Sequence, residues 1–237
     1  MGENRHNPDQ LLKAIQADEE NRNKGHLKIF FGYAAGVGKT YAMLEAAHME
    51  KQQGIDVVAG YVEPHAHPKT AALLNGLEVL PTREVFYNGM MLDEFDIGMA
   101  LKRKPQLILV DELAHTNAEG CRHAKRYQDI KELLNAGIDV YTTVNVQHIE
   151  SLCDTVSSIT EIVVQERIPD SLFDNADQVE LIDIEPQDLI DRLNTGNVYR
   201  QTQAKQVVEN FFTIENLTAL REISLRRCAD RVNILTE

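Results

Sequence analysis

The chain has 237 residues, of which 43% are hydrophobic and 26% are charged, a composition typical of a globular protein with a substantial buried core. Its formal net charge of −13 and its isoelectric point near 5.1 argue against a general attraction to nucleic acids or anionic membranes, because the field of the chain repels polyphosphates. No apolar run approaches the roughly 20 residues that crossing a bilayer needs, and the polar start is not a secretory signal. We therefore expect a cytoplasmic protein in which any nucleotide is held by a local site.

The first predicted elements lead to a glycine-rich loop. Residues 8–22 are typical of a short helix, with Pro8 near its first turn and an apolar stripe on one side. The compact apolar run HLKIFFGY at 26–33 predicts a strand that leads directly into the loop. Strong helix formers follow from residue 39 to an expected helix stop at Gly54.

The alternation of strand and helix then continues. Helices are expected at 68–77, 92–104 and 126–137, and strands at 55–63, 105–113, 138–146 and 178–184. The predicted strands are continuous apolar runs separated by helices, which predicts an α/β fold with a mostly parallel sheet covered by helices on both faces. We expect this fold to be of the phosphate-loop NTPase type. In such sheets the ligand crevice lies beyond the carboxyl ends of the strands.

The predicted organisation has three parts. Residues 1–24 form an N-terminal helical lead, and residues 25–193 form the nucleotide-binding α/β domain. From residue 194 to 237 the sequence is typical of helix throughout, with apolar faces that include Leu217 and Leu220. We interpret this tail as a helical extension that packs on the sheet domain or leads to a further domain.

The loop itself departs from the usual phosphate-loop pattern G-x-x-x-x-G-K-[ST]. The opening glycine is expected at position 33, but this position holds Tyr33 and the glycine is Gly32. Gly32 can supply flexibility one step earlier, so we expect a slightly reshaped entrance lined by Tyr33. Small residues allow backbone N–H groups to turn onto a phosphate. The predicted nucleotide-binding residues of the loop are Gly36, Val37, Gly38, Lys39 and Thr40.

The roles of these residues follow from the chemistry of magnesium nucleotides. Lys39 is expected to reach the terminal phosphates, and the Thr40 hydroxyl to bind Mg²⁺. The apolar run LILV ends in Asp111 and Glu112. Asp111 is the second expected ligand on the magnesium side, and Glu112 is the candidate catalytic residue that orients an attacking water. An accidental match of either motif is the alternative, made less attractive by the strand and helix around the loop.

Further polar residues follow two of the predicted strands. His115, Thr116, Asn117, Arg122, His123, Lys125 and Arg126 come just after the acidic pair. These cations either sense a terminal phosphate or form a solvated basic loop. Thr142, Thr143, Asn145, Gln147 and His148 lie at the end of the run at 138–146, where polar groups can report the presence of a phosphate.

Metal or disulfide chemistry is only weakly indicated. The widely separated Cys121, Cys153 and Cys228 predict neither a disulfide framework nor a thiolate metal site, in keeping with a reducing cytosol. His65 and His67 are spaced so that both can bind one metal ion, but nothing else marks a zinc site. We therefore interpret the segment that contains His65 and His67 as a mobile loop over the ligand crevice rather than as a metal site.

Several segments together resemble a known family. GYAAGVGKTYAMLEAA, DVVAGYVEPH, LEVLP, LILVDELAHTN, RYQDIKELLNAGIDVYTTVNVQHIESL and the tail from NFFTIENL onward are similar, in this order, to the N-terminal cytoplasmic domain of the KdpD family of potassium-responsive sensor histidine kinases. The resemblance spans residues 25 to 232. DELAHTN and YTTVNVQH are more specific than the loop, and the family's loop shares the shifted glycine.

The resemblance implies an ATP-binding regulatory domain that adjusts the balance of kinase and phosphatase activities and so the expression of potassium-transport genes. ATP, or another nucleotide, with Mg²⁺ is the implied ligand. The implied partners are the remaining domains of a sensor kinase, or a separate kinase or response regulator, with no nucleic acid and no membrane contact by this chain itself. His65 is followed by Ala66, His67 and Lys69 where the family often has His-Gly-Arg, so no role is carried over for that arginine.

Two other functions are compatible with the same residues. The chain can be a nucleotidase or phosphotransferase with its own substrate, in which case Glu112 is essential for turnover. For a regulatory domain, by contrast, we expect at most weak ATPase activity. It can also be an interaction module with a relic loop, against which the presence of Lys39, Thr40 and Asp111 counts.

Overall fold

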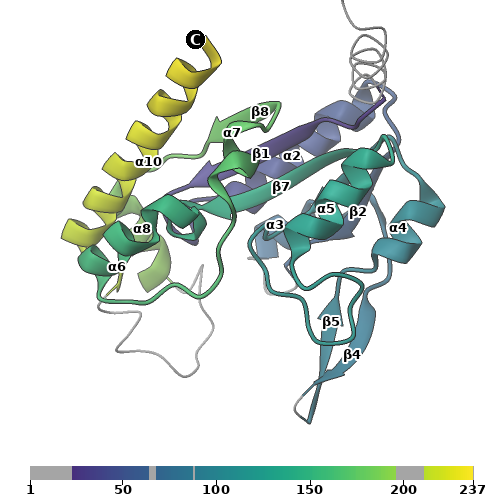
Figure 1. The fold of residues 1–237 in the computed structure, drawn as a ribbon, viewed down its shortest axis with the longest axis horizontal. Coiled ribbons are helices and arrows are strands. Elements are labelled where there is room, and N and C mark those ends of the chain that lie inside the picture. The colour runs from purple at the N-terminus through teal and green to yellow at the C-terminus, as the bar shows by residue number, and fades with distance from the viewer. Residues whose placement is uncertain (1–22, 64–67, 88, 196–210, 237) are drawn as a thin grey trace, which may run out of the picture.

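The structure, a computed structural model, describes residues 23–63, 68–87, 89–195 and 211–236. These residues form a mixed α/β unit with a mostly parallel sheet between helices (Figure 1). The expected α/β architecture is therefore confirmed. The helix expected at 8–22 lies outside the described residues.

The order of the elements agrees only in part with the order expected from the sequence. The strands are β1 (Leu27–Gly32), β2 (Val57–Tyr61), β3 (Glu78–Val79), β4 (Arg83–Tyr87), β5 (Met90–Glu94), β6 (Leu107–Val110), β7 (Asp139–Asn145) and β8 (Gln178–Leu181). The helices are α2 (Lys39–Gln52), α3 (Pro68–Ala72), α4 (Ile97–Arg103), α5 (Arg126–Asn135), α6 (Cys153–Thr160), α7 (Asp170–Asp174), α8 (Pro186–Asn194) and α10 (Ile214–Thr236). Two short 3-10 helices, Val146–His148 and Glu150–Leu152, connect β7 to α6. Strands and helices alternate as expected around β1, β2, β6 and β7, but in the described part of the chain β3, β4 and β5 follow one another without a helix between them and were not predicted.

The main sheet has six strands in the order β3-β2-β6-β7-β1-β8, and each neighbouring pair runs parallel. β7 lies between β1 and β6, with Gly32 opposite Asn145 and Leu107 opposite Asp139. Because the strands are parallel, the segments after β1, β6 and β7 all leave the sheet at the same edge. This edge carries the glycine loop, defined here as residues 33–38, and the acidic pair.

Each face of the sheet has its own hydrophobic cluster. Side chains of β1 alternate between them: Phe30 packs with α2, and Ile29 and Phe31 pack on the opposite face. α2 and the residues that follow α3 contribute to the first face, whereas α4, α5, α6, α7, α8 and α10 contribute to the second. Burial on both faces explains why these strands are written as continuous apolar runs.

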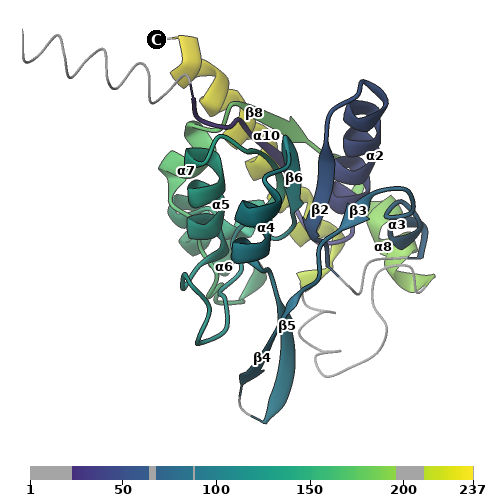
Figure 2. The same ribbon diagram turned by 90° about the vertical axis from the view of Figure 1, so that its right-hand side faces the viewer.

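One predicted helix begins too early. We expected a helix over 92–104, but residues Met90–Glu94 form β5, which pairs antiparallel with β4, and the helix begins only at Ile97. The Asp96 side chain accepts a hydrogen bond from the Met99 N–H and so caps α4. The β4–β5 hairpin projects away from the main sheet (Figures 1 and 2).

The described part of the tail is helical, as expected. α10 runs across the second face, and its Leu217 and Leu220 are fully buried in the same cluster as Phe31 of β1. Figure 1 shows α10 beside α8 and α6. Residues 196–210 of the tail lie outside the described residues.

Candidate functional site

The glycine loop joins β1 to α2 at the carboxyl edge of the sheet, where the sequence placed it. Gly36 and Gly38 have positive φ angles of 88° and 111°, a backbone conformation that residues with a side chain rarely adopt. The shift of the first glycine has a steric reason: a Cβ atom on Gly32 would lie 2.7 Å from Cγ2 of Val37 and 3.2 Å from Cδ of Lys39. A glycine is therefore needed at position 32, where the loop folds back over the end of β1.

Tyr33 does not line the loop entrance, contrary to our expectation. Its side chain is fully buried, and its hydroxyl donates a hydrogen bond of 3.1 Å to the carbonyl oxygen of Ile184, just after β8. Burial raises the pKa of the phenol to about 12. Tyr33 thus anchors the loop to the segment between β8 and α8.

Lys39 is the buried cation of the site. Its ammonium group donates a hydrogen bond of 2.9 Å to the Ala34 carbonyl oxygen, across the glycine loop. An ammonium group has three N–H donors, and two of them have no acceptor among the described residues. Burial lowers the pKa of Lys39 to about 8, although the charges of Asp111 and Glu112 oppose the shift. A buried ammonium with spare donors favours an anionic ligand.

The N-terminus of α2 adds to this preference. Among the described residues no side chain caps the helix, and its first turn carries no acidic residue. The first backbone N–H groups of a helix have no partner within the helix and attract anions. The glycine loop, Lys39 and the start of α2 together form a concentration of donors with little side-chain bulk.

Asp111 faces the same start of α2 from the end of β6. Its Oδ2 atom accepts a hydrogen bond of 3.0 Å from the hydroxyl of Thr40, and its Oδ1 atom accepts one from the hydroxyl of Thr143. Asp111 is almost completely buried. The structure thus brings together the two residues that the sequence assigns to Mg²⁺, and their oxygen atoms are of the type that this ion prefers. Thr40 and Asp111 are therefore suited to hold a magnesium ion.

Glu112 lies beside this pair in an unusual backbone conformation. Its φ angle is 59°, which is uncommon for a residue with a side chain and marks local strain. Burial, together with the negative charges of Glu63 and Asp111, raises the pKa of Glu112 to about 7. The side chain is nevertheless 44% exposed, so a water molecule can reach it. A carboxyl group with a pKa near neutrality suits general acid–base chemistry.

The end of β7 supplies polar groups next to the glycine loop. The side-chain oxygen atoms of Asn145 and Gln147 are buried and have no hydrogen-bond partner among the described residues. Asn145 pairs in register with Gly32, directly before the loop. Burial lowers the pKa of His148 to about 4, with Glu166 opposing the shift and Lys39 adding to it. His148 is therefore neutral at pH 7.

Among the cations of the predicted basic loop, Arg126 differs most from the expectation of a solvated or phosphate-sensing side chain. Its side chain is completely buried, with Nη2 placed 3.1 Å from Oε2 of Glu94 and the guanidinium 4.1 Å from the ring centre of Tyr61. Nη1 donates a bond of 3.3 Å to the Asp111 carbonyl oxygen. His115 also contacts Glu94, at 3.1 Å. Arg126 thus ties the β4–β5 hairpin to the acidic pair.

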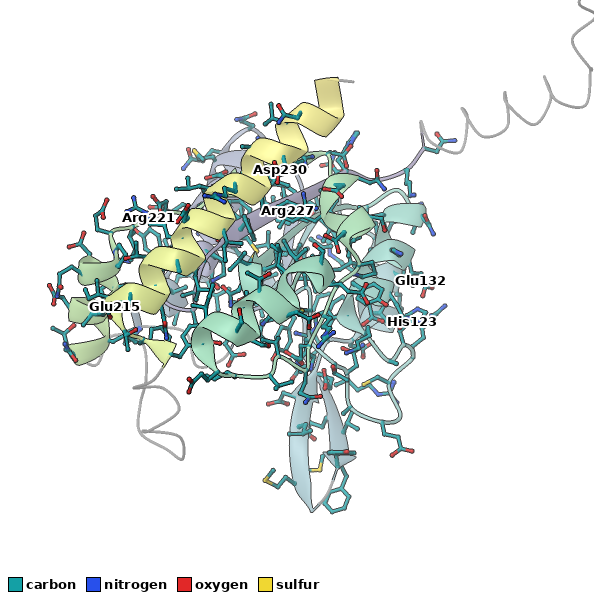
Figure 3. The ribbon with its side chains drawn as sticks, turned by 60° about the vertical axis from the view of Figure 1, so that its left-hand side comes forward. His123, Glu132, Glu215, Arg221, Arg227 and Asp230 are labelled. Atoms are coloured by element: carbon teal, nitrogen blue, oxygen red, sulfur yellow. The ribbon has the colours of Figure 1, made fainter. Side chains whose placement is uncertain are left out.

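The remaining cations of that loop bind protein groups. Arg122 pairs with Glu132 on α5 at 2.5 Å. His123 pairs with the same carboxylate at 2.8 Å, and Figure 3 labels His123 and Glu132. The ammonium of Lys125 donates to the Thr116 hydroxyl. In the described part of the chain none of these three cations contacts the glycine loop, so the structure favours a structural role for them.

Sequence reasoning missed two members of this region. Glu94 is 3% exposed and binds Arg126, His115 and the Ala118 N–H, yet it lies in a segment we expected to be helical. Burial raises its pKa, but the His115 and Ala118 hydrogen bonds and the charge of Arg126 bring it below the usual value. Tyr61 stacks on Arg126 at the end of β2. Only the position of Tyr61 at a strand end was a usable signal.

The remaining expectations concern metal binding and membrane insertion. His65 and His67 lie outside the described residues. Within the described residues, no group of three or more His, Cys, Asp or Glu side chains is arranged to hold a metal ion. No helix in the described ranges is both long and apolar enough to cross a membrane.

Comparisons with known proteins connect the chain to one family. The model of the family described as "KdpD: Osmosensitive K+ channel His kinase sensor domain" matches residues 23–232. The chain is 60% identical over 233 residues to the sensor protein KdpD of Clostridium acetobutylicum and 55% identical over 229 residues to that of Escherichia coli K12, covering 98% and 97% of this chain. It spans only 26% and 25% of those two relatives. A putative sensor protein KdpD of Synechocystis is 50% identical over 88% of this chain and 56% of its own length.

Proposed function

The chain belongs to the family of KdpD sensor domains, and we propose that it is the nucleotide-binding regulatory domain of a potassium-responsive two-component sensor kinase. The proposed ligand is ATP, or another nucleotide, with Mg²⁺. The proposed partners are the other domains of such a kinase, in keeping with relatives about four times as long as the matched region. The division into residues 1–24, 25–193 and 194–237 is part of this proposal.

One observation carries the proposal: within the described residues, the buried ammonium of Lys39 donates one hydrogen bond, to the Ala34 carbonyl oxygen, and no side chain caps the start of α2 beside it. A triphosphate supplies the acceptors that this arrangement lacks. Gly36, Val37 and Gly38 would surround the phosphates with backbone N–H groups. Thr40 and Asp111, already 3.0 Å apart, would hold Mg²⁺, which would neutralise charge on the phosphates.

A regulatory role needs a route from the nucleotide to other parts of the protein. The Asp111 carbonyl oxygen accepts a hydrogen bond from Arg126, and Arg126 binds Glu94 at the base of the projecting hairpin. Tyr33 links the other end of the glycine loop to the segment before α8. Changes at the loop would therefore reach two elements at the periphery of the domain.

A second candidate function, a nucleotidase or phosphotransferase, is favoured by Glu112. Its pKa of about 7 and its place directly after Asp111 suit a group that orients a water molecule or accepts a proton. In this case the rate of phosphate release would depend on Glu112. In the regulatory alternative, release is slow and binding is the output.

Calorimetric titration with Mg-ATP tests the proposal. We expect saturable binding by the natural chain and a loss of at least about tenfold in affinity in Lys39→Ala, because a charge-assisted hydrogen bond to phosphate is removed. Lys102→Ala is the matched control, because Lys102 is an exposed lysine on α4. Equal affinities in all three proteins, or no binding by any, would sink the proposal in favour of an interaction module.

A phosphate-release assay on the same samples separates the two functions. Slow release that is insensitive to Glu112→Gln supports the regulatory domain. Fast release that Glu112→Gln abolishes while Mg-ATP still binds supports the enzyme.

A further inference from the structure

Arg192 lies at the glycine loop although it is 153 residues away from Lys39 in the sequence. It belongs to α8, which follows β8, the edge strand next to β1. A Cβ atom built on Gly38 would lie 4.0 Å from Nη1 of Arg192 and 4.0 Å from Cγ2 of Ile182. The chain therefore brings a guanidinium group beside the residue that precedes Lys39.

The charge of Arg192 is not used within the described part of the protein. Its guanidinium forms no ion pair or hydrogen bond there, and the residue is exposed. Arg221 and Arg227 of α10, labelled in Figure 3, differ, because Arg221 binds Asp183 at 2.7 Å and Arg227 binds Asp174 at 2.5 Å. In a chain with a net charge of −13, an arginine without a carboxylate partner beside a cluster of backbone donors points to an anion.

α8 is a fixed support for this side chain. Leu189 of α8 is fully buried in the hydrophobic cluster that also contains Leu217 and Leu220 of α10. Pro186 begins the helix, and Tyr33 binds the Ile184 carbonyl just before it. The glycine loop, α8 and α10 are therefore mechanically connected.

We propose that Arg192 binds the phosphate chain of the nucleotide held at the glycine loop, on the side opposite the magnesium ligands. This inference rests on the proposed function and adds one residue to its site. A guanidinium offers several N–H donors in a plane, which matches two phosphate oxygen atoms at once. Binding then attaches α8 to the ligand, and through Leu189 it couples the state of the site to α10.

Titrations with two probes, Mg-ATP and magnesium tripolyphosphate, test this assignment. Arg192→Gln is expected to weaken both by about tenfold, since both carry the phosphate chain. Arg192→Lys should recover part of this loss, because the charge remains but the planar donors do not. Arg226→Gln is the control, because Arg226 lies on α10 and is 75% exposed. This variant should bind both probes as the natural chain does.

The outcomes distinguish this inference from the function on which it rests. Natural affinities for both probes in Arg192→Gln, with binding lost in Lys39→Ala, would overturn only the role of Arg192. A loss confined to Mg-ATP would also overturn it, since the contact would then be to the base or ribose. If the natural chain and Lys39→Ala bind equally or not at all, both proposals fail. Unchanged thermal unfolding of Arg192→Gln would confirm that the fold is intact, as expected for an exposed side chain.

Discussion

Two arginine–carboxylate clusters connect different parts of this molecule, and they differ in burial. The Arg126 cluster comprises Arg126, Glu94, His115 and Tyr61, and its arginine is fully buried. The Arg221 cluster comprises Arg221, Asp183 and Glu185, and its arginine is 26% exposed. The first connects the hairpin to the acidic pair, and the second attaches α10 to the segment after β8. The same chemical pair therefore has very different energetic consequences, because water can replace a lost partner only at the second.

The largest expected effect is at the Arg126 cluster. Arg126→Met should lower the free energy of unfolding by about 3–5 kcal/mol, because it leaves the carboxylate of Glu94 buried without its cation. Chemical denaturation measures the loss. Arg122→Met provides the matched control, since Arg122 is 52% exposed where it pairs with Glu132, and the change should cost less than about 0.5 kcal/mol.

A second variant identifies the cause of this loss. In Arg126→Met with Glu94→Leu, no charge is left buried without a partner, so part of the stability should return. If the double variant loses as much as the two single variants together, the unpaired charge is not the reason and the explanation by burial is wrong.

The main strands were predictable because both faces of the sheet are buried. Their residues form continuous apolar runs, and β1, β6 and β7 lie within the predicted ranges 26–33, 105–113 and 138–146. The β4–β5 hairpin was missed although its segment is apolar: Phe86, Tyr87, Met90 and Met91 are exposed rather than buried in the core, and the sequence Asn88-Gly89 between them is a hairpin signal that we did not use. Its segment contains helix formers, and Asp96, the residue that caps α4, was the signal that would have corrected the start of the helix.

The site was predictable only where its residues are neighbours in sequence or follow strands. The loop residues and Asp111 lie together because parallel strands end at one edge of the sheet, which is a rule of the fold. Burial of Arg126 depends on Glu94 and Tyr61, which come from other elements, so the sequence alone suggested a solvated or phosphate-sensing cation. The proximity of Arg192 to Gly38 likewise depends on how α8 packs, which no local pattern encodes.

A smaller effect is expected where the Arg126 cluster meets the acidic pair. The pKa of Glu112 is raised from 4.5 to about 7, so the folded state binds more protons than the unfolded state between these values. Stability is therefore lost as the pH rises through this window. Glu112→Gln removes the charge, and above pH 7 it should be more stable than the natural chain by about 1.5 kcal/mol, a value reduced for solvent screening.

This difference should vanish below about pH 4.5, because Glu112 is then neutral in both states. Denaturation of both proteins across the pH range measures it, and the other titrating groups cancel in the comparison. Glu119→Gln, in an exposed position of the same loop, should show no such dependence. A gain that is constant with pH would contradict the assignment to the charge of Glu112.

The smallest effect is expected at the Arg221 cluster. Arg221→Gln should lower the free energy of unfolding by about 0.5–1 kcal/mol, because the guanidinium binds both oxygen atoms of Asp183 within 3.0 Å but remains in contact with water. High salt should reduce this loss, since ions screen partly exposed charges, whereas it should leave the loss in Arg126→Met nearly unchanged. Arg226→Gln, whose ion pair with Glu222 is 75% and 60% exposed, should have no measurable effect at either salt concentration. Equal salt sensitivity at Arg126 and Arg221 would mean that water reaches both clusters, and the contrast between a buried link to the hairpin and a solvated attachment of α10 would be lost.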